Sequence, residues 1–398
     1  MTQFAQKASS KNIWRDGELL SPFSGAPLRR DTEYSLFDGT NRFPLIEEIP
    51  YLRANREELI ENALEKLDAG NVEDATILLL QDQDDWARTD APTTEDLQPL
   101  FKNENLNLRE AMRCLKYGAV ADYFAFRWSD PTFLSGLKLL ATHLSKEEKK
   151  NFELACGIGH FLREFEKLGI EATGADVVFS KLWLARKFVA SEAKLVCVDA
   201  NFNLPFADKT FDAAFCHDAF YFLPRKNHVA DELKRTTNGA ILIGHAHNRN
   251  AENFSSGAAI SSREYAALFE NSVLYDDAEL TAAFIENRLP VESAIEILEK
   301  TEAVSLAFSA RSKSDFREIK GGNLRVNPLL FDSENCICRE PQYPSKRYRD
   351  EYAPLSNYLN LSADEAEKLR DFEIENLSQT EIEDFTRRRI LLDLPENW

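Results

Sequence analysis

The sequence is poor in positive charge and has no long hydrophobic run. Its 398 residues include 48 Lys and Arg against 67 Asp and Glu, which gives a formal net charge of −19. A surface of this sign repels polyanions, so it argues against nucleic acid and anionic membranes as partners. No apolar run approaches the length that spans a bilayer, and residues 1–20 lack the apolar core of a secretion signal. We therefore expect a cytoplasmic protein.

Cysteine is also scarce. Six cysteines are scattered along the chain, and Cys336 and Cys338 form the one close pair. Scattered cysteines, some of them within apolar runs, suit reduced thiols better than a disulfide framework. A metal site at the close pair would need a second pair of ligands, and no further Cys or His lies near it in the sequence. We interpret the pair as two side chains on one face of a strand, and we predict no bound metal.

Changes of pattern divide the chain into segments. The first segment alternates Pro and Gly with short apolar runs, which is typical of a small β-rich module, and the second has apolar residues at helical spacing. Between 151 and 248, short apolar runs alternate with helical patterns, which predicts a doubly wound α/β fold with a parallel sheet covered on both faces. The predicted units are a β-rich module at 1–54, a helical connector at 55–110, the α/β domain at 111–311 and an extension at 312–398 with a helical tail from Ala363 to Leu392.

A loop with two glycines follows the first strand of the α/β region. Gly157 and Gly159 stand where this strand gives way to a helix, so the backbone can turn tightly and a ligand can approach the helix N-terminus. A dinucleotide-binding enzyme would place a third glycine at position 162, which is Leu162 here. This weakens the case for a pyrophosphate and favours a ligand held by an acid and by backbone amides.

Acidic residues stand in or at the end of three successive strands. Glu153 lies in the first strand, Asp176 closes the second and Asp199 closes the third. A carboxylate at the end of the second strand can accept both hydroxyls of a ribose. An adenine could be bound at Asp199 and the backbone beside Ala200. Any one of these acids alone would be interpreted as a capping or surface residue, but the series predicts a nucleoside site.

This pattern resembles a known family. Residues 153–159 resemble the first motif of class I S-adenosylmethionine-dependent methyltransferases, and Asp176 and Asp199-Ala200 are similar to the second and third motifs. Residues 203–218 look like the fourth strand of that family and its approach. The sequence departs from the first motif at Ala155, where the family has a glycine. The resemblance implies a Rossmann-like, mostly parallel seven-stranded sheet, with S-adenosylmethionine as cofactor and S-adenosylhomocysteine as product.

The resemblance also implies roles for single residues. Glu153 would orient the loop and the methionine amino group, and the two glycines would let the backbone approach the methionine. Asp176 would hold the ribose, and Asp199 with Ala200 would contact adenine. The predicted cofactor-binding residues are Glu153, Ala155, Gly157, Gly159, Asp176, Asp199, Ala200, Asp218, Tyr123 and Arg127.

Histidines stand at the ends of the fourth and fifth strands. His245 and His247 would point to the same side of the fifth strand, and the carboxyl ends of such strands face a ligand crevice. With an ordinary pKa of about 6.5, either histidine could remove a proton from an acceptor hydroxyl or amine. His217 and Asp218 add a second polar cluster. We predict His245, His247 and His217 as catalytic residues, with structural hydrogen bonding and metal binding as the alternatives.

A second resemblance concerns the N-terminal module. Residues 20–28 and 42–50 look like the small zinc-ribbon family that activates tRNA, ribosomal and protein methyltransferases. That family has cysteines where Ser21 and Ser24 stand here, and serine hydroxyls are not structural zinc ligands. We interpret the module as a metal-free ribbon, with an unrelated β-hairpin as the alternative.

Together these features predict methyl transfer from S-adenosylmethionine to an O or N atom of an acceptor. The acidic charge favours a small molecule, a natural-product intermediate or a peptide as that acceptor. One alternative is a ribosomal RNA methyltransferase, against which the missing Lys and Arg stripe speaks. Another is a non-catalytic scaffold that binds the cofactor and partners another protein.

Overall fold

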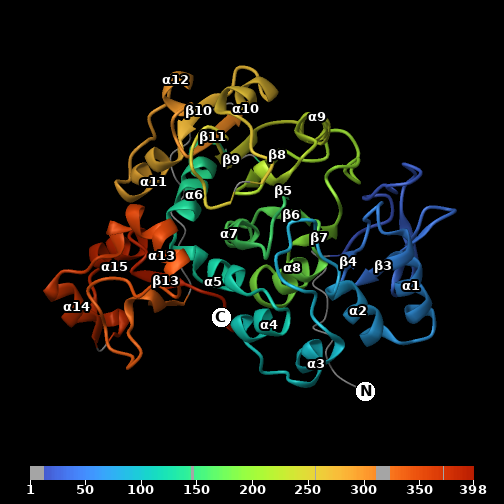
Figure 1. Cartoon of the computed structure of the whole chain (residues 1–398), viewed down its shortest axis with the longest axis horizontal. Coiled ribbons are helices and arrows are strands. Elements are labelled where there is room, and N and C mark those ends of the chain that lie inside the picture. The colour runs from blue at the N-terminus through green and yellow to red at the C-terminus, as the bar shows by residue number, and fades with distance from the viewer. Residues whose placement is uncertain (1–12, 145–147, 256, 311–322, 371) are drawn as a thin grey trace.

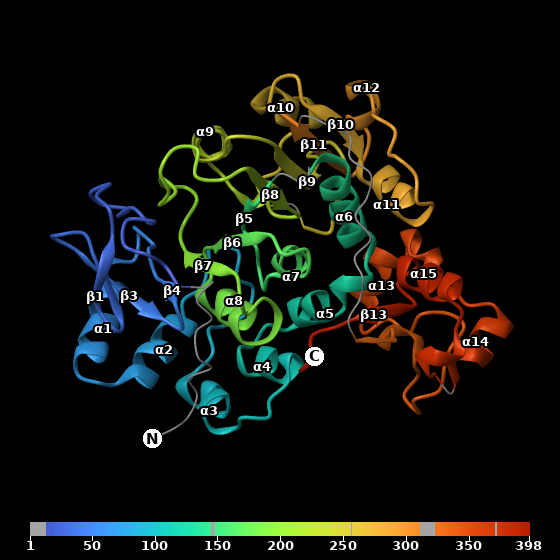
Figure 2. The ribbon, with the colours of Figure 1, turned by 180° about the vertical axis from the view of Figure 1, so that it is seen from behind.

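The computed structural model describes residues 13–144, 148–255, 257–310, 323–370 and 372–398. These residues form a central α/β body, with a small β module against one side and a helical extension against the other (Figures 1 and 2). Residues 1–12 of the predicted N-terminal module and the predicted boundary between 311 and 312 lie outside the described residues.

The centre is a seven-stranded sheet in the order β10-β11-β9-β8-β5-β6-β7. The pairs from β9 through β8, β5 and β6 to β7 are parallel, whereas β11 runs antiparallel to both β9 and β10. This confirms the predicted doubly wound, mostly parallel fold. The strands are β5 (Lys150–Leu154), β6 (Glu171–Asp176), β7 (Lys194–Cys197), β8 (Ala213–His217), β9 (Ile241–His247), β10 (Val273–Asp276) and β11 (Ala303–Phe308).

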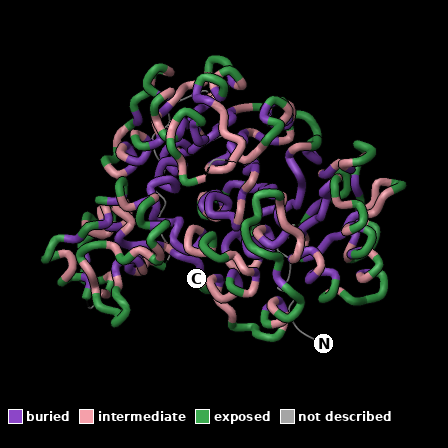
Figure 3. Tube along the Cα trace, in the orientation of Figure 1, coloured by how far each residue is buried: buried purple, intermediate pink, exposed green. Residues whose placement is uncertain are grey.

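The sheet lies in the buried centre of the molecule, while exposed residues gather in the outer loops and the two flanking regions (Figure 3). Every residue of β8 and of β9 is buried, which explains why both read as apolar runs in the sequence. The strand order reverses at β5, which pairs with β6 on one side and β8 on the other. In such sheets a ligand crevice opens at the carboxyl ends of the two central strands.

Helices alternate with the strands along this region. The alternation is the one expected from the sequence, except that the predicted helix 181–190 is α8 followed by a π-helical turn at Ala185–Val189. The helices are α6 (Pro131–His143), α7 (His160–Lys167), α8 (Phe179–Leu184), α9 (Lys226–Thr236), α10 (Ser262–Leu268), α11 (Asp277–Ile285) and α12 (Ile295–Leu298).

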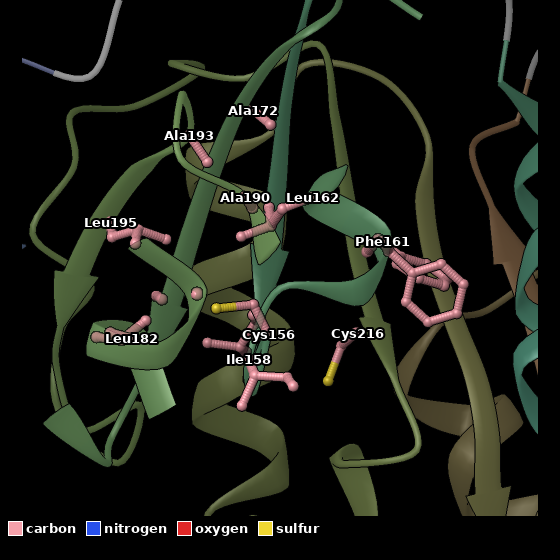
Figure 4. Packing of buried hydrophobic residues seen from close by; sticks show 14 of the residues in the cluster. Cys156, Ile158, Phe161, Leu162, Ala172, Leu182, Ala190, Ala193, Leu195 and Cys216 are labelled. Carbon is pink, nitrogen blue, oxygen red and sulfur yellow. The ribbon is translucent and has the colours of Figure 1, made fainter. Parts of the chain in front are cut away.

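An apolar cluster lies beneath the loop between β5 and α7 (Figure 4). Leu162, which stands where a dinucleotide-binding enzyme would have glycine, is fully buried in it. A Cβ atom added to Gly174 of β6 would lie 2.5 Å from Leu162 Cδ1 and 2.8 Å from Cys156 Sγ. The glycine that permits close packing of helix on strand is therefore in β6 instead of in α7.

The N-terminal module is a four-stranded antiparallel sheet, with β1 (Arg29–Thr32), β2 (Ser35–Phe37), β3 (Arg42–Ile46) and β4 (Ile49–Pro50). It covers the edge of the central sheet at β7. Leu52 N donates to Cys197 O at 2.8 Å, and Trp14 Nε1 donates to Leu195 O at 3.1 Å. Because an uncovered edge strand invites pairing with other chains, this contact protects β7.

Helices follow the N-terminal module. α1 (Glu57–Asp68) and α2 (Val72–Leu80) form a hairpin, and α3 (Thr94–Lys102) and the start of α4 (Leu108–Cys114) also fall within the predicted connector, residues 55–110. α5 (Ala119–Phe126) lies in the predicted α/β domain, and the chain breaks between α4 and α5. Gly118 there has a φ of 55°, a left-handed conformation that a helix interior does not allow.

The C-terminal extension has its own small apolar cluster, which includes Leu330, Ile390 and Leu391. The predicted helical tail, from Ala363 to Leu392, consists of α14 (Ala363–Arg370) and α15 (Gln379–Arg387). It ends in strand β13 (Leu391–Asp393), which pairs with β12 (Leu324–Val326) and which was not predicted. The helix α13 (Lys346–Tyr352) lies beside α5 in both views (Figures 1 and 2).

The predicted strand at Cys336 and Cys338 is also wrong. In the described chain this segment is a loop with one isolated bridge, between Phe331 and Ile337, and both cysteines are free. Among the described residues, no helix is long and apolar enough to cross a membrane.

Candidate active site

A cavity of about 520 Å³ opens at the carboxyl ends of the central strands. The predicted residues Glu153, Ala155, Gly157, Asp176, Asp199, Ala200, His217, Asp218, Tyr123 and Arg127 all line it. Two segments outside the sheet complete the wall, namely residues 83–89 after α2 and the helix α13. Gly159 is not among the described lining residues, and it begins α7 behind the loop.

The loop between β5 and α7 needs left-handed backbone at three positions. Ala155, Gly157 and Gly159 have φ values of 55°, 56° and 86°. A Cβ atom added to Gly159 would also lie 3.1 Å from Ala190 Cβ, so the position requires glycine on two grounds. Ala155 accepts the conformation that the family's glycine would adopt without strain, at a cost of about 1–2 kcal/mol.

Glu153 lines this cavity and has one unpaired carboxylate oxygen. The residue is 3% exposed, and its Oε2 atom is buried with no hydrogen-bond partner among the described residues. Burial raises the pKa of Glu153 well above its ordinary value. A ligand cation beside it would supply both the missing partner and the charge that keeps a buried carboxylate ionised.

Asp176 and Asp199 are held by local hydrogen bonds. Asp176 accepts from Gly157 N and Val178 N at 2.9 Å each, so it ties β6 to the glycine loop. Asp199 Oδ1 accepts from both Asn201 N and Asn201 Nδ2 at 2.9 Å, and its Oδ2 accepts from Asn55 Nδ2 at 3.3 Å. Since both oxygens of Asp176 and the Oδ2 of Asp199 each have a second lone pair, both acids can still accept from a ligand.

Asp218 is the centre of a polar cluster at the opposite end of the cavity. Its Oδ2 accepts from Tyr123 OH at 2.7 Å and from Arg127 NH1 at 3.1 Å, and its Oδ1 accepts from Tyr221 OH at 3.1 Å. Burial opposes the charged form, but His245 and Arg127 outweigh it and hold the pKa of Asp218 below its ordinary value. Asp218 is therefore an ionised carboxylate whose Oδ2 accepts two hydrogen bonds and whose Oδ1 accepts one.

His245 and His247 point to the same side of β9, as predicted, and their Nε2 atoms lie 3.2 Å apart. His245 Nδ1 is 2.7 Å from Asp277 Oδ2, while His247 Nδ1 is 2.6 Å from the carbonyl oxygen of Ser255. His247 also stacks on Tyr221, with ring centroids 4.0 Å apart. Neither histidine is among the described lining residues of this cavity, so the pair lies beside its wall.

The two rings differ in charge. Burial lowers the pKa of His245, but Asp277 and Asp218 outweigh this and raise it to about 9. Burial and then the charge of His245 lower the pKa of His247 to about 4. At neutral pH, and with no other cation present, His245 is therefore protonated and His247 is neutral.

His217 lies in a third environment. Its Nε2 donates to the carbonyl oxygen of Thr132 at 2.7 Å, and burial followed by Arg127 lowers its pKa to about 3. Its Nδ1 abuts β9, since a Cβ atom added to Gly244 would lie 2.1 Å from it. His217 is thus neutral, with its free nitrogen directed at the sheet.

Several lining residues were missed by the sequence analysis. Trp86 lies in the loop after α2, with its ring 5.3 Å from that of Phe222, and Tyr348, Glu351 and Tyr352 come from α13. None stands at a strand end or in a motif, so no sequence signal marks them. Asp277, the partner of His245, could have been suspected as an acid at the start of a helix, but its pairing follows only from the fold.

Comparison with known proteins identifies the central region. Residues 152–243 match a family model described as a methyltransferase domain. No curated protein matches the chain significantly. One similar solved structure, described as a possible histamine N-methyltransferase from Thermotoga maritima, is 18% identical, covers 48% of this chain and 93% of its own, and has a TM-score of 0.34.

Two further structures are similar at the same level. A chain from the complex between the Haloferax volcanii Trm112 methyltransferase activator and a methyltransferase is 16% identical, covers 48% of this chain and 94% of its own, and has a TM-score of 0.36. The phosphoethanolamine N-methyltransferase 2 of Haemonchus contortus, in complex with phosphomonomethylethanolamine and S-adenosylhomocysteine, is 15% identical, covers 46% of this chain and 49% of its own, and has a TM-score of 0.35.

The family match, the sheet order and the acid-and-glycine loop agree with one another. The predictions of a methyltransferase and of a Rossmann-like fold are thereby confirmed. S-adenosylmethionine is the cofactor that this loop and the matched domain support.

Proposed function

We propose that the protein transfers a methyl group from S-adenosylmethionine to an O or N atom of a small molecule or peptide bound in the 520 Å³ cavity. The observation that carries the proposal is the unpaired, buried Oε2 of Glu153 at the mouth of a left-handed loop. A buried carboxylate oxygen without a partner is costly, and the ammonium group of a methionine moiety would satisfy it.

The residues that would hold the cofactor all reach the same cavity. Glu153 would bind the amino group, the backbone at Gly157 would approach the methionine, and Asp176 would accept from the ribose hydroxyls. Asp199 and Ala200 would contact adenine. The cofactor supplies an activated methyl group when bound, so the protein needs chiefly to position the acceptor and to accommodate its proton.

The size and make-up of the cavity support a small acceptor. Its volume falls within the range of about 300–1,000 Å³ typical of small-molecule sites, and the cofactor would take part of it. Trp86, Tyr221, Tyr348 and Tyr352 supply aromatic surface at the acceptor end, and Glu351 supplies a carboxylate. Burial raises the pKa of Glu351, and the charge of Asp218 adds to the effect.

The role of the histidines as general bases stays a prediction, and the geometry limits it. His245 already carries a proton, and the free nitrogen of His217 faces the sheet. Direct proton transfer from an acceptor would therefore have to occur at His247 Nε2, with His245 and Asp277 as positioning residues. That atom faces His245, so a ring movement would have to accompany the transfer.

We also propose that residues 1–54 are a metal-free relative of the zinc-ribbon activators, fused to the enzyme that they stabilise. The loop that would carry zinc is held by hydrogen bonds instead. Ser21 Oγ accepts from Ser24 N at 3.3 Å, and Ser24 Oγ donates to Asp38 Oδ2 at 2.8 Å. The contact of the module with β7 gives it a structural reason to be fused.

Calorimetric titration with S-adenosylmethionine and S-adenosylhomocysteine tests the proposed function. Wild-type protein should bind at least one of them, and Glu153→Gln should bind both more weakly, because a neutral amide pairs less strongly with an ammonium. Asp208→Ala, in the loop before β8, is the matched control and should bind as wild type. Absence of binding at millimolar ligand would refute the proposal.

A further inference from the structure

Two imidazole rings and one carboxylate converge beside the acceptor end of the cavity. They belong to His245 and His247 at the end of β9 and to Asp218 just after β8. One ligand atom from each of the three residues lies within 4.8 Å of the other two. Neither the proposed binding of the cofactor nor the aromatic acceptor surface uses the two ring nitrogens that face each other.

The far side of each ring is fixed by a hydrogen bond. A backbone carbonyl can only accept, so His247 Nδ1 carries the proton that it gives to Ser255 O at 2.6 Å. The Asp277 carboxylate likewise receives the Nδ1 proton of His245 at 2.7 Å, and its other oxygen accepts from Ser305 Oγ at 2.8 Å. With both Nδ1 protons committed, the two Nε2 atoms face each other 3.2 Å apart.

Two ring nitrogens this close repel unless a cation binds both of them. A proton can do this, and so can a metal ion. Two nitrogens that bind one Zn²⁺ at about 2.0–2.1 Å in tetrahedral geometry are separated by about 3.3 Å, which is close to the observed value. Asp218 Oδ1 lies 3.9 Å from His245 Nε2 and can complete a set of three ligands.

We propose that His245, His247 and Asp218 form a binding site for a first-row divalent ion, with Zn²⁺ as the preferred occupant. Two imidazoles and a carboxylate suit zinc and its neighbours, whereas Mg²⁺ and Ca²⁺ prefer oxygen ligands throughout. The hydrogen bonds from the two Nδ1 atoms to Asp277 and to Ser255 O are the outer support that metal-binding histidines require. The proposal differs from our prediction of no bound metal and takes up the metal-binding alternative for the histidines.

The position of the site suggests what the ion does. Three protein ligands leave at least one coordination position for water or for an oxygen of the acceptor. Asp218 lines the cavity and links the three ligands to Tyr123, Arg127 and Tyr221. An ion here would orient an acceptor oxygen, and it would replace the general-base role of the histidines. The inference does not depend on which methyl donor binds.

Binding of Co²⁺ tests the site directly, because its visible absorption reports the ligands and the coordination number. Metal-free wild-type protein should take up one equivalent of Co²⁺, with the bands of a nitrogen-ligated ion of low coordination number. Zn²⁺ should displace it. His247→Phe keeps an aromatic ring against Tyr221 but removes the ligand nitrogen, and it should weaken binding at least roughly 100-fold.

His228→Ala, on α9 away from the cluster, is the matched control and should bind Co²⁺ as wild type. Circular dichroism and thermal unfolding of His247→Phe check that it is folded, and Asp218→Asn gives a second variant that should also lose affinity. The proposal is overturned if wild type shows no such bands at millimolar Co²⁺, or if folded His247→Phe binds as tightly as wild type. Because no adenosyl ligand is added, the result is separate from that of the cofactor titration.

Discussion

The two ends of the cavity are built in different ways. The proposed cofactor end comes from consecutive elements, β5 to β7, and uses backbone groups and acids at strand ends. The acceptor end is assembled from α5, the loop after α2, the end of β8 and α13, which lie far apart in the sequence. The first end depends on the geometry of the fold itself, whereas the second depends on how this chain's additional segments pack against it.

The comparison predicts where stability and binding are coupled. The cofactor end rests directly on the apolar core, so damage to the core should disturb it first. The following predictions test that difference, beginning with the largest expected effect.

Leu162→Ala should destabilise the protein most. The side chain is fully buried between α7 and β6, and removal of such a Leu leaves a cavity that costs about 2–5 kcal/mol. Urea unfolding measures the loss. Trp86→Ala, at the acceptor end, is the contrasting variant, because Trp86 is 43% exposed and should cost far less stability. Equal losses would contradict the larger contribution to stability expected from the packing of α7 on β6.

Asp176→Ala should weaken cofactor binding while leaving the acceptor end intact. Hydrogen bonds to a charged group contribute roughly 1.5–3 kcal/mol each, so the loss of its ribose contacts should lower affinity at least about 10-fold. The variant also frees Gly157 N and Val178 N, which loosens the loop. Calorimetry with S-adenosylhomocysteine measures the change, and Asp208→Ala again provides the baseline. Identical affinities for the two variants would remove Asp176 from the site.

The same difference separates what the sequence could and could not predict. Glu153, Asp176 and Asp199 were found because strand ends and glycine spacing are local features, and the carboxyl ends of parallel strands must meet. The partnership of His245 with Asp277 could not be found, since it depends on the antiparallel insertion of β11 between β9 and β10. Tyr348 and Glu351 were missed for the same reason: nothing local in α13 indicates that it closes a cavity.

The errors in secondary structure have local causes. Helical periodicity continues across residues 115–118, but Gly118 takes a left-handed conformation and ends the regular pattern. The C-terminal tail was predicted to be helical from Ala363 to Leu392. Ile390 and Leu391 instead join a small cluster that pairs β13 with β12, so burial in a tertiary contact overrides the helical pattern.

A pH dependence should arise at the cofactor end from His160. The ring is buried at the start of α7, donates to Phe124 O at 2.9 Å, and has a pKa that burial and then Arg127 lower to about 3. The unfolded chain takes up a proton below about pH 6.5, while the folded chain does not until about pH 3. Stability is therefore present above pH 6.5 and is lost as the pH falls, by on the order of 1.4 kcal/mol per unit.

His160→Gln retains an N–H donor toward Phe124 O but does not titrate. We expect its unfolding free energy, measured by urea titration between pH 6 and pH 4, to fall less steeply than that of wild type. The difference in slope should correspond to the uptake of roughly one proton on unfolding. Parallel slopes for the two proteins would mean that His160 is already protonated in the folded state.

The smallest expected effect concerns Ala155, the one departure from the family's loop. With a φ of 55°, Ala155 is strained by about 1–2 kcal/mol, and Ala155→Gly would relieve this. Glycine also increases the entropy of the unfolded chain, which lowers the unfolding free energy by about 0.4–1 kcal/mol. The net result should be a gain of up to about 1.6 kcal/mol in unfolding free energy, together with equal or slightly tighter binding of S-adenosylhomocysteine. Ala175→Gly is the control, because Ala175 lies in β6 without a positive φ and should only lose stability. If Ala155→Gly is instead as destabilising as Ala175→Gly, then the methyl group of Ala155 contributes packing that outweighs the strain. The packing around the loop would then differ from that expected of the family.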